Sequence, residues 1–356
     1  MNIDNRQHDP ARHDHPGCPQ PSTEARRRRV LAWGRCVAVC IAVLLLSACA
    51  SETHLSFLDA QGPVADAQRW HFYWVLIIMT VLVAGPIFLL TPFWAWRYRY
   101  GAKKSRYTPN WKFSRTLELM SWGGPIVIVA ILAVFVWRDS HKLDPYKPLA
   151  SNQPALHVQV IGYDWKWLFI YPDQGIASIG TLAMPVGRPV AMHLTSATVM
   201  QSFFIPALGS QIYAMGGMDT QLNLEAGKPG RSLGENTMYN GNGFHQQKFI
   251  AVAMPPTEFE AWVSKVRAHG IPLTSQILAI VAQRATRSDL IAALPGANSM
   301  EGDVYFTSVS KSLYAAVIKA TSDGSPVALA AAPHDDTKVP TTAARNSPTP
   351  VMGKEP

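Results

Sequence analysis

Cysteine is scarce in this sequence of 356 residues and is absent after position 49. The four cysteines are Cys18, Cys36, Cys40 and Cys49. The chain beyond them therefore has no disulfide framework and no thiolate to hold copper, zinc or an iron–sulfur cluster. The histidines lack the spacing of a metal site, and no phosphate-binding loop or nucleophile elbow occurs. We therefore expect no catalytic residue and no metal site in this chain.

Charged residues are missing from two long apolar stretches. Residues 72–96 are 25 consecutive uncharged positions, and residues 119–137 are 19 more. Each stretch is long enough to cross the hydrocarbon core of a bilayer as a helix. Tryptophan and tyrosine gather at the ends of the first stretch, as in the aromatic belts of membrane proteins. The sequence predicts transmembrane helices over residues 70–96 and 117–137.

Acidic residues are missing from the segment between these two stretches. Residues 97–115 contain seven Lys or Arg and no Asp or Glu. Because short basic loops stay inside the cell, we predict a cytoplasmic loop over residues 97–116 and a periplasmic location for everything after the second helix. The net charge is +8, but much of the positive charge lies beside apolar runs. That distribution indicates membrane topology and no nucleic-acid partner.

The N-terminus has the layout of a bacterial export signal. Four arginines at residues 26–29 precede an uncharged run at residues 36–48. The sequence LSAC at residues 46–49 resembles the lipobox of bacterial lipoproteins, which implies cleavage before Cys49 and lipid attachment to its sulfur. We predict a lipoprotein signal peptide over residues 1–48 and a periplasmic segment over residues 49–69. The alternative is an ordinary buried cysteine in a first transmembrane helix.

The sequence after the second apolar stretch has patterns that are typical of β-strands. Short runs of β-branched and aromatic residues alternate with Gly, Pro, Asn and Asp, which predicts an all-β sandwich over residues 138–256. Residues 257–322 follow amphipathic helical patterns and predict a helical C-terminal arm. Residues 323–356 are rich in Ala, Pro and Thr and are typical of a disordered tail.

Three motifs resemble subunit II of the haem–copper oxidases. They are ELMSWGGP at residues 118–125, YDWKWLFIYPDQGIAS at residues 163–178, and LTSATVMQSFFIPALGSQIYAMGGM at residues 194–218. The resemblance extends over roughly residues 49–270. It implies a membrane hairpin of two helices that carries a periplasmic cupredoxin-like sandwich.

The resemblance also identifies the positions at which copper-bearing members hold a dinuclear copper centre with Cys, His, Glu and Met ligands. Here the six positions are occupied by Gln201, Asn236, Met238, Asn240, Phe244 and Gln247. All six ligands are replaced, and His245 lies one residue away from the second histidine position. This pattern resembles the quinol-oxidase branch of the family, the cytochrome bo type, in which quinol delivers electrons within the membrane.

This branch implies a function in a respiratory complex of the bacterial inner membrane. The chain would be subunit II of a terminal ubiquinol oxidase that reduces oxygen and pumps protons, with no redox centre of its own. It would scaffold and cap subunit I, which carries haems and one copper, beside smaller subunits III and IV and membrane lipid. Ubiquinol would be the substrate, and soluble cytochrome c would not be a partner. Two alternatives remain: a cytochrome c oxidase subunit II with degenerate ligands, and a stand-alone membrane-anchored cupredoxin-like binding lipoprotein.

Glu118 is an acid at the expected cytoplasmic start of the second span. Because a charged group at a membrane boundary is costly, its presence indicates a role. The resemblance places it near the entrance of a proton pathway into subunit I. The alternative is a helix-start acid that is stabilised by the helix dipole.

Several other side chains have a functional and a packing interpretation. Trp165 and Trp167 would line an electron path in copper-bearing relatives, but without copper we expect them to pack at a subunit interface. The methionines offer thioether ligands, but without nearby cysteine we expect them to fill the core or an interface. These are Met200, Met215 and Met218.

Overall fold

A computed structural model describes residues 53–54, 58–100, 112–209, 211–294 and 302–325. The predictions for the signal peptide and Cys49, and most of the predicted tail, lie outside these residues, as does most of the basic loop.

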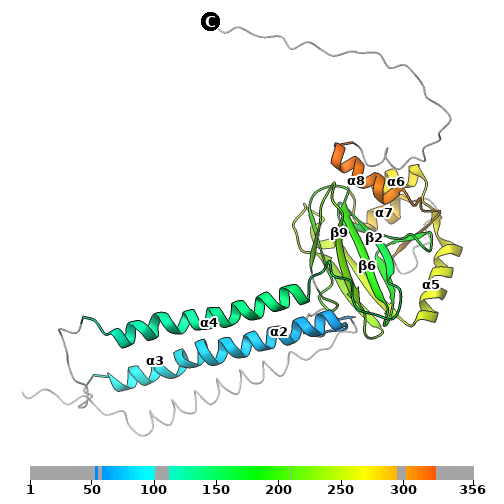
Figure 1. Ribbon diagram of the computed structural model, residues 1–356. Helices are drawn as coiled ribbons and strands as arrows, with labels where there is room; N and C mark the ends of the chain where they lie inside the picture. The colour runs from blue at the N-terminus through cyan, green and yellow to red at the C-terminus, as the bar shows by residue number, and fades with distance from the viewer. Residues whose placement is uncertain (1–52, 55–57, 101–111, 210, 295–301, 326–356) are drawn as a thin grey trace, which may run out of the picture. The chain divides into compact units, whose positions relative to one another are not determined.

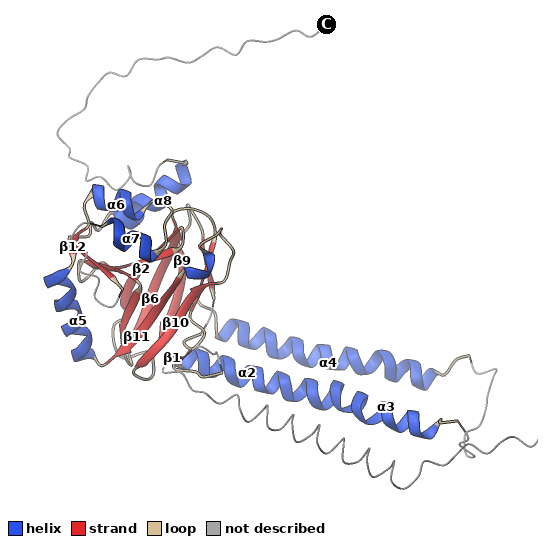
Figure 2. Cartoon of the chain, turned by 180° about the vertical axis from the view of Figure 1, so that it is seen from behind, coloured by secondary structure: helices blue, strands red, loops and turns tan. Residues whose placement is uncertain are grey.

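Two long apolar helices lie side by side (Figures 1 and 2). The first runs continuously over Pro63–Arg97 and the second over Arg115–Lys142, which is α4. Both are long and apolar enough to cross a bilayer. Each is longer than the predicted membrane segment because the helix continues into polar residues at its ends.

The first helix contains one wide turn that accommodates a proline. It consists of α2 (Pro63–Met79), the π-helical turn η1 (Thr80–Ala84) and α3 (Gly85–Arg97). The N–H of Gly85 donates to the carbonyl of Thr80, five residues earlier. Because Pro86 has no N–H and its ring would collide with the preceding turn of a regular helix, the wider turn lets the helix continue without a break.

The remaining chain forms a sandwich of two mixed β-sheets (Figure 2). The first sheet has the order β5-β11-β10-β7-β8 with β1 beside β10, and the second has the order β12-β13-β4-β3-β2-β6-β9. The strands of the first sheet are β1 Thr53–His54, β5 Thr181–Pro185, β7 Gln201–Phe204, β8 Ile212–Ala214, β10 Gly230–Asn236 and β11 Lys248–Met254. The strands of the second sheet are β2 Leu156–Tyr163, β3 Lys166–Tyr171, β4 Ile176–Ile179, β6 Pro189–Ser196, β9 Thr220–Glu225, β12 Ile271–Pro272 and β13 Val304–Thr307.

Apolar side chains from both sheets meet in the centre of the sandwich. Phe203 of the first sheet stacks on Phe249, with ring centroids 5.0 Å apart, and Trp167 of the second sheet meets Phe203 edge-on at 5.2 Å. Such pairs add directional contacts to the hydrophobic gain of burial. Trp167 is therefore part of this chain's own core instead of an interface with another subunit.

The helices of the C-terminal arm are α5 Pro256–His269, α6 Ser275–Val281, α7 Arg287–Ala293 and α8 Leu313–Asp323. Of these, α6, α7 and α8 cover the outer face of the second sheet, and α5 packs against the central core. Ile161 and Leu168 point away from the central core and pack with arm residues such as Leu278 and Val317. All six residues of β3 are buried for this reason, because one face meets the other sheet and the opposite face meets the arm.

The arm also contributes strands, which the helical patterns did not predict. β13 pairs antiparallel with β4, and β12 pairs parallel with β13. The two short strands cover an edge of the second sheet that would otherwise expose unpaired backbone groups. The predicted hairpin, β-sandwich and C-terminal arm are confirmed as an architecture, with the addition of these two strands.

Candidate functional site: a buried amide network

Four of the six positions that the resemblance assigned to copper ligands meet inside the sandwich. They lie at the start of β7, at the end of β10, in the following loop and just before β11. All four carry side-chain amides and are at most 7% exposed, and they are Gln201, Asn236, Asn240 and Gln247. Antiparallel pairing of β10 with β7 sets Asn236 opposite Phe203, two residues from Gln201, and so brings the loops together.

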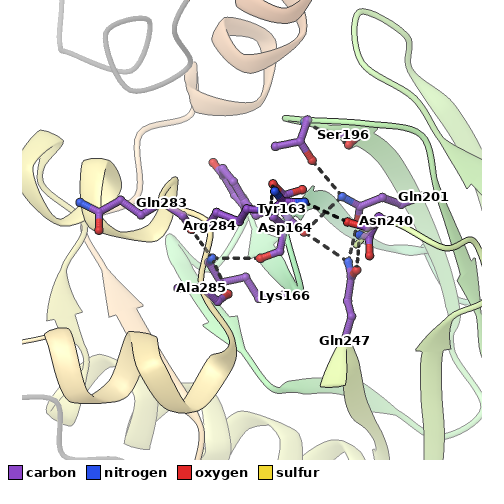
Figure 3. A network of polar contacts seen from close by, with 11 residues as sticks. Tyr163, Asp164, Lys166, Ser196, Gln201, Asn240, Gln247, Gln283, Arg284 and Ala285 are labelled. Atoms are coloured by element: carbon purple, nitrogen blue, oxygen red, sulfur yellow. Dashed lines mark hydrogen bonds and ion pairs between the residues drawn. The ribbon is translucent and has the colours of Figure 1, made fainter. Parts of the chain in front are cut away.

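Gln247 lies at the centre of a continuous hydrogen-bond network (Figure 3). Its Nε2 donates to Oε1 of Gln201 at 2.5 Å, and its Oε1 accepts from Nδ2 of Asn240 at 2.7 Å and of Asn236 at 3.0 Å. The Nε2 groups of Gln201 and Gln247 also donate to the carbonyl of Tyr163, at 3.1 and 3.3 Å. The network thereby ties the start of β7 and the connection between β10 and β11 to the end of β2.

Asn236 extends the network to the backbone. Its Oδ1 accepts from the N–H of Ser202 at 2.9 Å and of Met238 at 3.0 Å, and its Nδ2 donates to the carbonyl of Met238 at 2.8 Å. Met238 therefore takes part through its main chain. The Phe244 ring, half-buried, packs on Tyr239 with centroids 5.8 Å apart and takes no part in the network.

The donor set of this site does not fit a copper centre. Side-chain amides are neutral, and they are hard ligands compared with the thiolates and imidazoles that electron-transfer copper prefers. Here the amides already satisfy one another, except that Oδ1 of Asn240 is buried with no hydrogen-bond partner in the described part of the chain. Within that part, no three His, Cys, Asp or Glu side chains lie close enough to hold a metal ion. The amides cross-link the loops in place of metal–ligand bonds.

The turn between β2 and β3 places Trp165 over the same loops. Trp165 has a φ of +68°, a conformation that costs a non-glycine residue about 1–2 kcal/mol. Its ring lies against Gly243, where an added Cβ would be 2.1 Å from the indole. On this ring lies the guanidinium of Arg284, with its carbon 5.0 Å from the ring centroid. These contacts hold the turn in its unfavourable conformation.

Lys166 fastens the C-terminal arm to this turn. It is 2% exposed, and its Nζ donates to the carbonyls of Gln283 at 2.7 Å, Ala285 at 3.0 Å and Asp164 at 3.3 Å (Figure 3). Burial lowers the pKa of Lys166 from 10.5 to about 8, although the carboxylates of Asp164 and Asp289 act in the opposite direction. Sequence reasoning did not identify this lysine. Its one signal was a cation inside an otherwise aromatic and apolar strand.

The other predicted site residues lie apart from the network. Glu118 is in the first turn of α4 with an exposed side chain, and Cys49 lies outside the described residues. Met200 and Met218 are 43% and 51% exposed and Met215 is half-buried, so Met200 and Met218 lie on the surface of this chain and not in its core.

The hairpin, the sandwich and the amide-filled copper positions together define a membrane-anchored subunit of the oxidase subunit II class. The chain is 46% identical over 235 residues to ubiquinol oxidase subunit 2 of Acetobacter aceti, covering 65% of this chain and 75% of the relative. It is 42% identical over 228 residues to cytochrome bo(3) ubiquinol oxidase subunit 2 of Buchnera aphidicola subsp. Baizongia pistaciae, covering 64% and 79%. The chain belongs to the ubiquinol oxidase subunit 2 family, and the predicted resemblance is confirmed.

Two further comparisons complete this result. No protein-family model matches the chain. The periplasmic domain of subunit II of cytochrome oxidase of Bradyrhizobium japonicum aligns with a TM-score of 0.32 and 22% identity, covering 33% of this chain and 98% of that one. The family relationship argues against the stand-alone lipoprotein and for a subunit of an oxidoreductase complex.

Proposed function

We propose that this chain is the non-catalytic subunit 2 of a ubiquinol oxidase that reduces oxygen to water and pumps protons. The observation that carries the proposal is the buried amide network at the copper-ligand positions, in a chain of this family. Neutral amides that bond to one another offer no redox-active centre, so electrons would not pass through the sandwich. They would enter subunit I directly from quinol in the membrane.

The proposal assigns the redox chemistry to other subunits. Subunit I would hold the haems and one copper, and subunits III and IV would complete the complex. Soluble cytochrome c would not be a donor, because its electrons would have no relay in this chain. The sandwich would cap subunit I from the periplasm while the helical hairpin packs beside it.

The proposed topology follows from charge and the N-terminal motif. Seven Lys or Arg without an acid between the helices favour a cytoplasmic loop, and a lipobox at Cys49 favours an acylated N-terminus outside. These two expectations agree on a chain that begins and ends in the periplasm of a bacterial inner membrane. The acyl group would add to an anchor that the two helices already provide.

Glu118 is proposed to admit protons to subunit I. Its carboxylate is exposed at the expected cytoplasmic end of α4, next to an uncharged run of 19 residues. A titratable group at that level is in reach of cytoplasmic water and of a neighbouring subunit. The competing role is that of a helix-start acid stabilised by the helix dipole, which would affect stability and not turnover.

The deciding experiment measures the purified complex. Affinity purification through this chain in mild detergent should bring haem, which appears in the visible spectrum. Oxygen uptake should begin on addition of ubiquinol and should not begin on addition of reduced cytochrome c. Uptake with cytochrome c would instead support a copper relay, and a preparation without haem would support a protein that acts alone.

A further inference from the structure

A groove runs between α2 and α4 near the ends of both apolar runs. Its volume is about 500 Å³. Trp70 and Trp74 of α2 line one wall, and Phe135, Arg138 and Lys142 of α4 line the other. Trp70 precedes the uncharged residues 72–96 and Arg138 directly follows the uncharged residues 119–137, so the groove lies at the level where a membrane meets water.

The groove carries a net positive charge. Two carboxylates also line it. Arg69 neutralises Asp66, so the cations Arg138 and Lys142 outnumber the remaining carboxylate, Asp139, by one charge while His71 is neutral. Asp139 contacts His71 across the two helices, and Asp66 contacts Arg69 within α2. Arg138 and Lys142 are exposed, and no ion pair is found for either within the described residues. The groove therefore attracts an anion.

The aromatic side chains Trp70, Trp74 and Phe135 give the groove an apolar part. Trp70 and Trp74 are 58% and 53% exposed, and Phe135 is 38% exposed. A small inorganic anion would satisfy the cations and leave these rings in water. A molecule with an anionic head and a hydrocarbon tail would satisfy both parts of the groove.

We propose that this groove binds one membrane phospholipid. Its phosphodiester would lie between Arg138 and Lys142, and one acyl chain would follow Trp74 and Phe135 towards the membrane centre. The proposal rests on the membrane-spanning hairpin of the proposed function. The contact between His71 and Asp139 joins the helices at the same level, so the bound lipid would also stabilise the hairpin at its periplasmic end.

The test uses the intact complex in vesicles of phosphatidylethanolamine and phosphatidylglycerol, with a trace of phosphatidylglycerol that carries a photoreactive diazirine on one acyl chain. After illumination, labelled peptides are mapped by mass spectrometry. The label should concentrate beside Trp74 and Phe135, along which the acyl chain runs. Each Lys or Arg near a membrane surface attracts anionic lipid headgroups. Removing both cations by Arg138→Gln with Lys142→Gln should therefore lower this label about tenfold.

A matched control removes two cations at the other end of α4, Arg115 in its first turn and Lys112 just before it. Lys112→Gln with Arg115→Gln should leave the label in the groove unchanged, and Arg138→Lys with Lys142→Arg should retain most of it. Excess inorganic phosphate should not displace the label. If it did, the groove would be a site for a free anion and not for a lipid, and the proposal would be wrong.

Three other outcomes would overturn the proposal. Uniform labelling along both helices would indicate ordinary surrounding lipid. An unlabelled groove in the wild type would mean that a neighbouring protein segment or the acyl group of Cys49 fills it. Equal labelling of the wild type and of the variant with Arg138→Gln and Lys142→Gln would show that the two cations do not hold the lipid. Haem is measured in the same sample, so a labelled chain without haem would count against the oxidase function and not against the lipid.

Discussion

The side-chain nitrogen of Gln247 donates to the side-chain oxygen of Gln201 over 2.5 Å, in the buried region where β7 and β11 begin. The two residues are 46 positions apart in the sequence, and the resemblance to oxidase subunit II assigned both positions to copper ligands. Both are almost completely buried. A buried amide that loses its partner is far more costly than an exposed one, so this contact makes the loop conformation dependent on hydrogen bonds.

The first prediction concerns the stability of this network. Gln247→Ala removes the partner of Gln201 Oε1 and of the side-chain nitrogens of Asn236 and Asn240. Because these groups stay buried, the free energy of unfolding should fall by about 3 kcal/mol in urea titrations. The protein measured is a fragment, the sandwich with its C-terminal arm, expressed without the two long helices. The neighbouring exposed residue provides a control, and Gln246→Ala should change the free energy of unfolding by less than about 0.5 kcal/mol. Equal effects of the two substitutions would contradict a buried network.

The second prediction concerns Lys166 and pH. The pKa of Lys166 in the folded state, about 8, is below the ordinary value of 10.5. The unfolded chain therefore binds more protons between these values, and the free energy of unfolding should rise with pH through this window, by about 2 kcal/mol from pH ~7 to pH ~9.5. The rise is measured by urea titration up to about pH 9.5, below the range in which tyrosines titrate.

Lys166→Met should remove this pH-dependent rise. It should also lower the free energy of unfolding at neutral pH by about 2 kcal/mol, because the carbonyls of Gln283 and Ala285 lose their donor. Lys248→Met removes a half-exposed lysine from β11 and should keep the rise. A slope that persists in Lys166→Met would assign it to another group.

The third prediction concerns a variant with copper-ligand side chains at the six positions that the resemblance identified. Six substitutions together should create a copper site with a strong visible absorption band: Gln201→His, Asn236→Cys, Met238→Glu, Asn240→Cys, Phe244→His and Gln247→Met. The loops already bring four of these positions together, so the ligands should meet without a change of fold. The unchanged fragment should hold no stoichiometric copper by elemental analysis. Copper in the unchanged fragment would contradict the proposed absence of a redox centre.

The fourth prediction separates the two roles of Glu118. If it admits protons, Glu118→Ala should slow oxygen uptake per haem, and Glu118→Asp should retain more activity because it keeps a carboxyl group. If it is only a helix-start acid, the loss should appear as about 0.3–1 kcal/mol of stability, with unchanged uptake per haem. Glu258→Ala, at the start of α5 in the C-terminal arm, is the control for the second role.

The fifth prediction concerns Cys49. Radiolabelled fatty acid should enter the mature chain, and Cys49→Ala should abolish the labelling. The variant should remain in the membrane fraction, because two transmembrane helices hold a protein far more firmly than acyl chains. Cys49→Ala protein in the soluble fraction would show that the helices do not span the membrane.

The helical hairpin and the sandwich were predictable because their signals are local. An uncharged run of 25 residues forms a helix in a bilayer whatever surrounds it, since only a helix satisfies its backbone there. The β-sandwich followed from short aromatic and β-branched runs between turn residues. The strands β12 and β13 were missed because each is short and is stabilised by the sheet edge it joins, not by its own residues.

The sequence by itself determined the two long apolar helices and the β-rich domain, because composition and local patterning are enough for each. Through the resemblance it also predicted the replacement of six copper ligands. Only the tertiary structure decided that four replacement amides bond to one another and that Lys166 holds the arm. The Gln247 amide meets the Tyr163 carbonyl 84 positions away, and Lys166 meets Gln283 across 117 positions. A hydrogen bond requires a distance of about 3 Å and a defined angle, and such a geometry exists only after the sheets and the arm have packed.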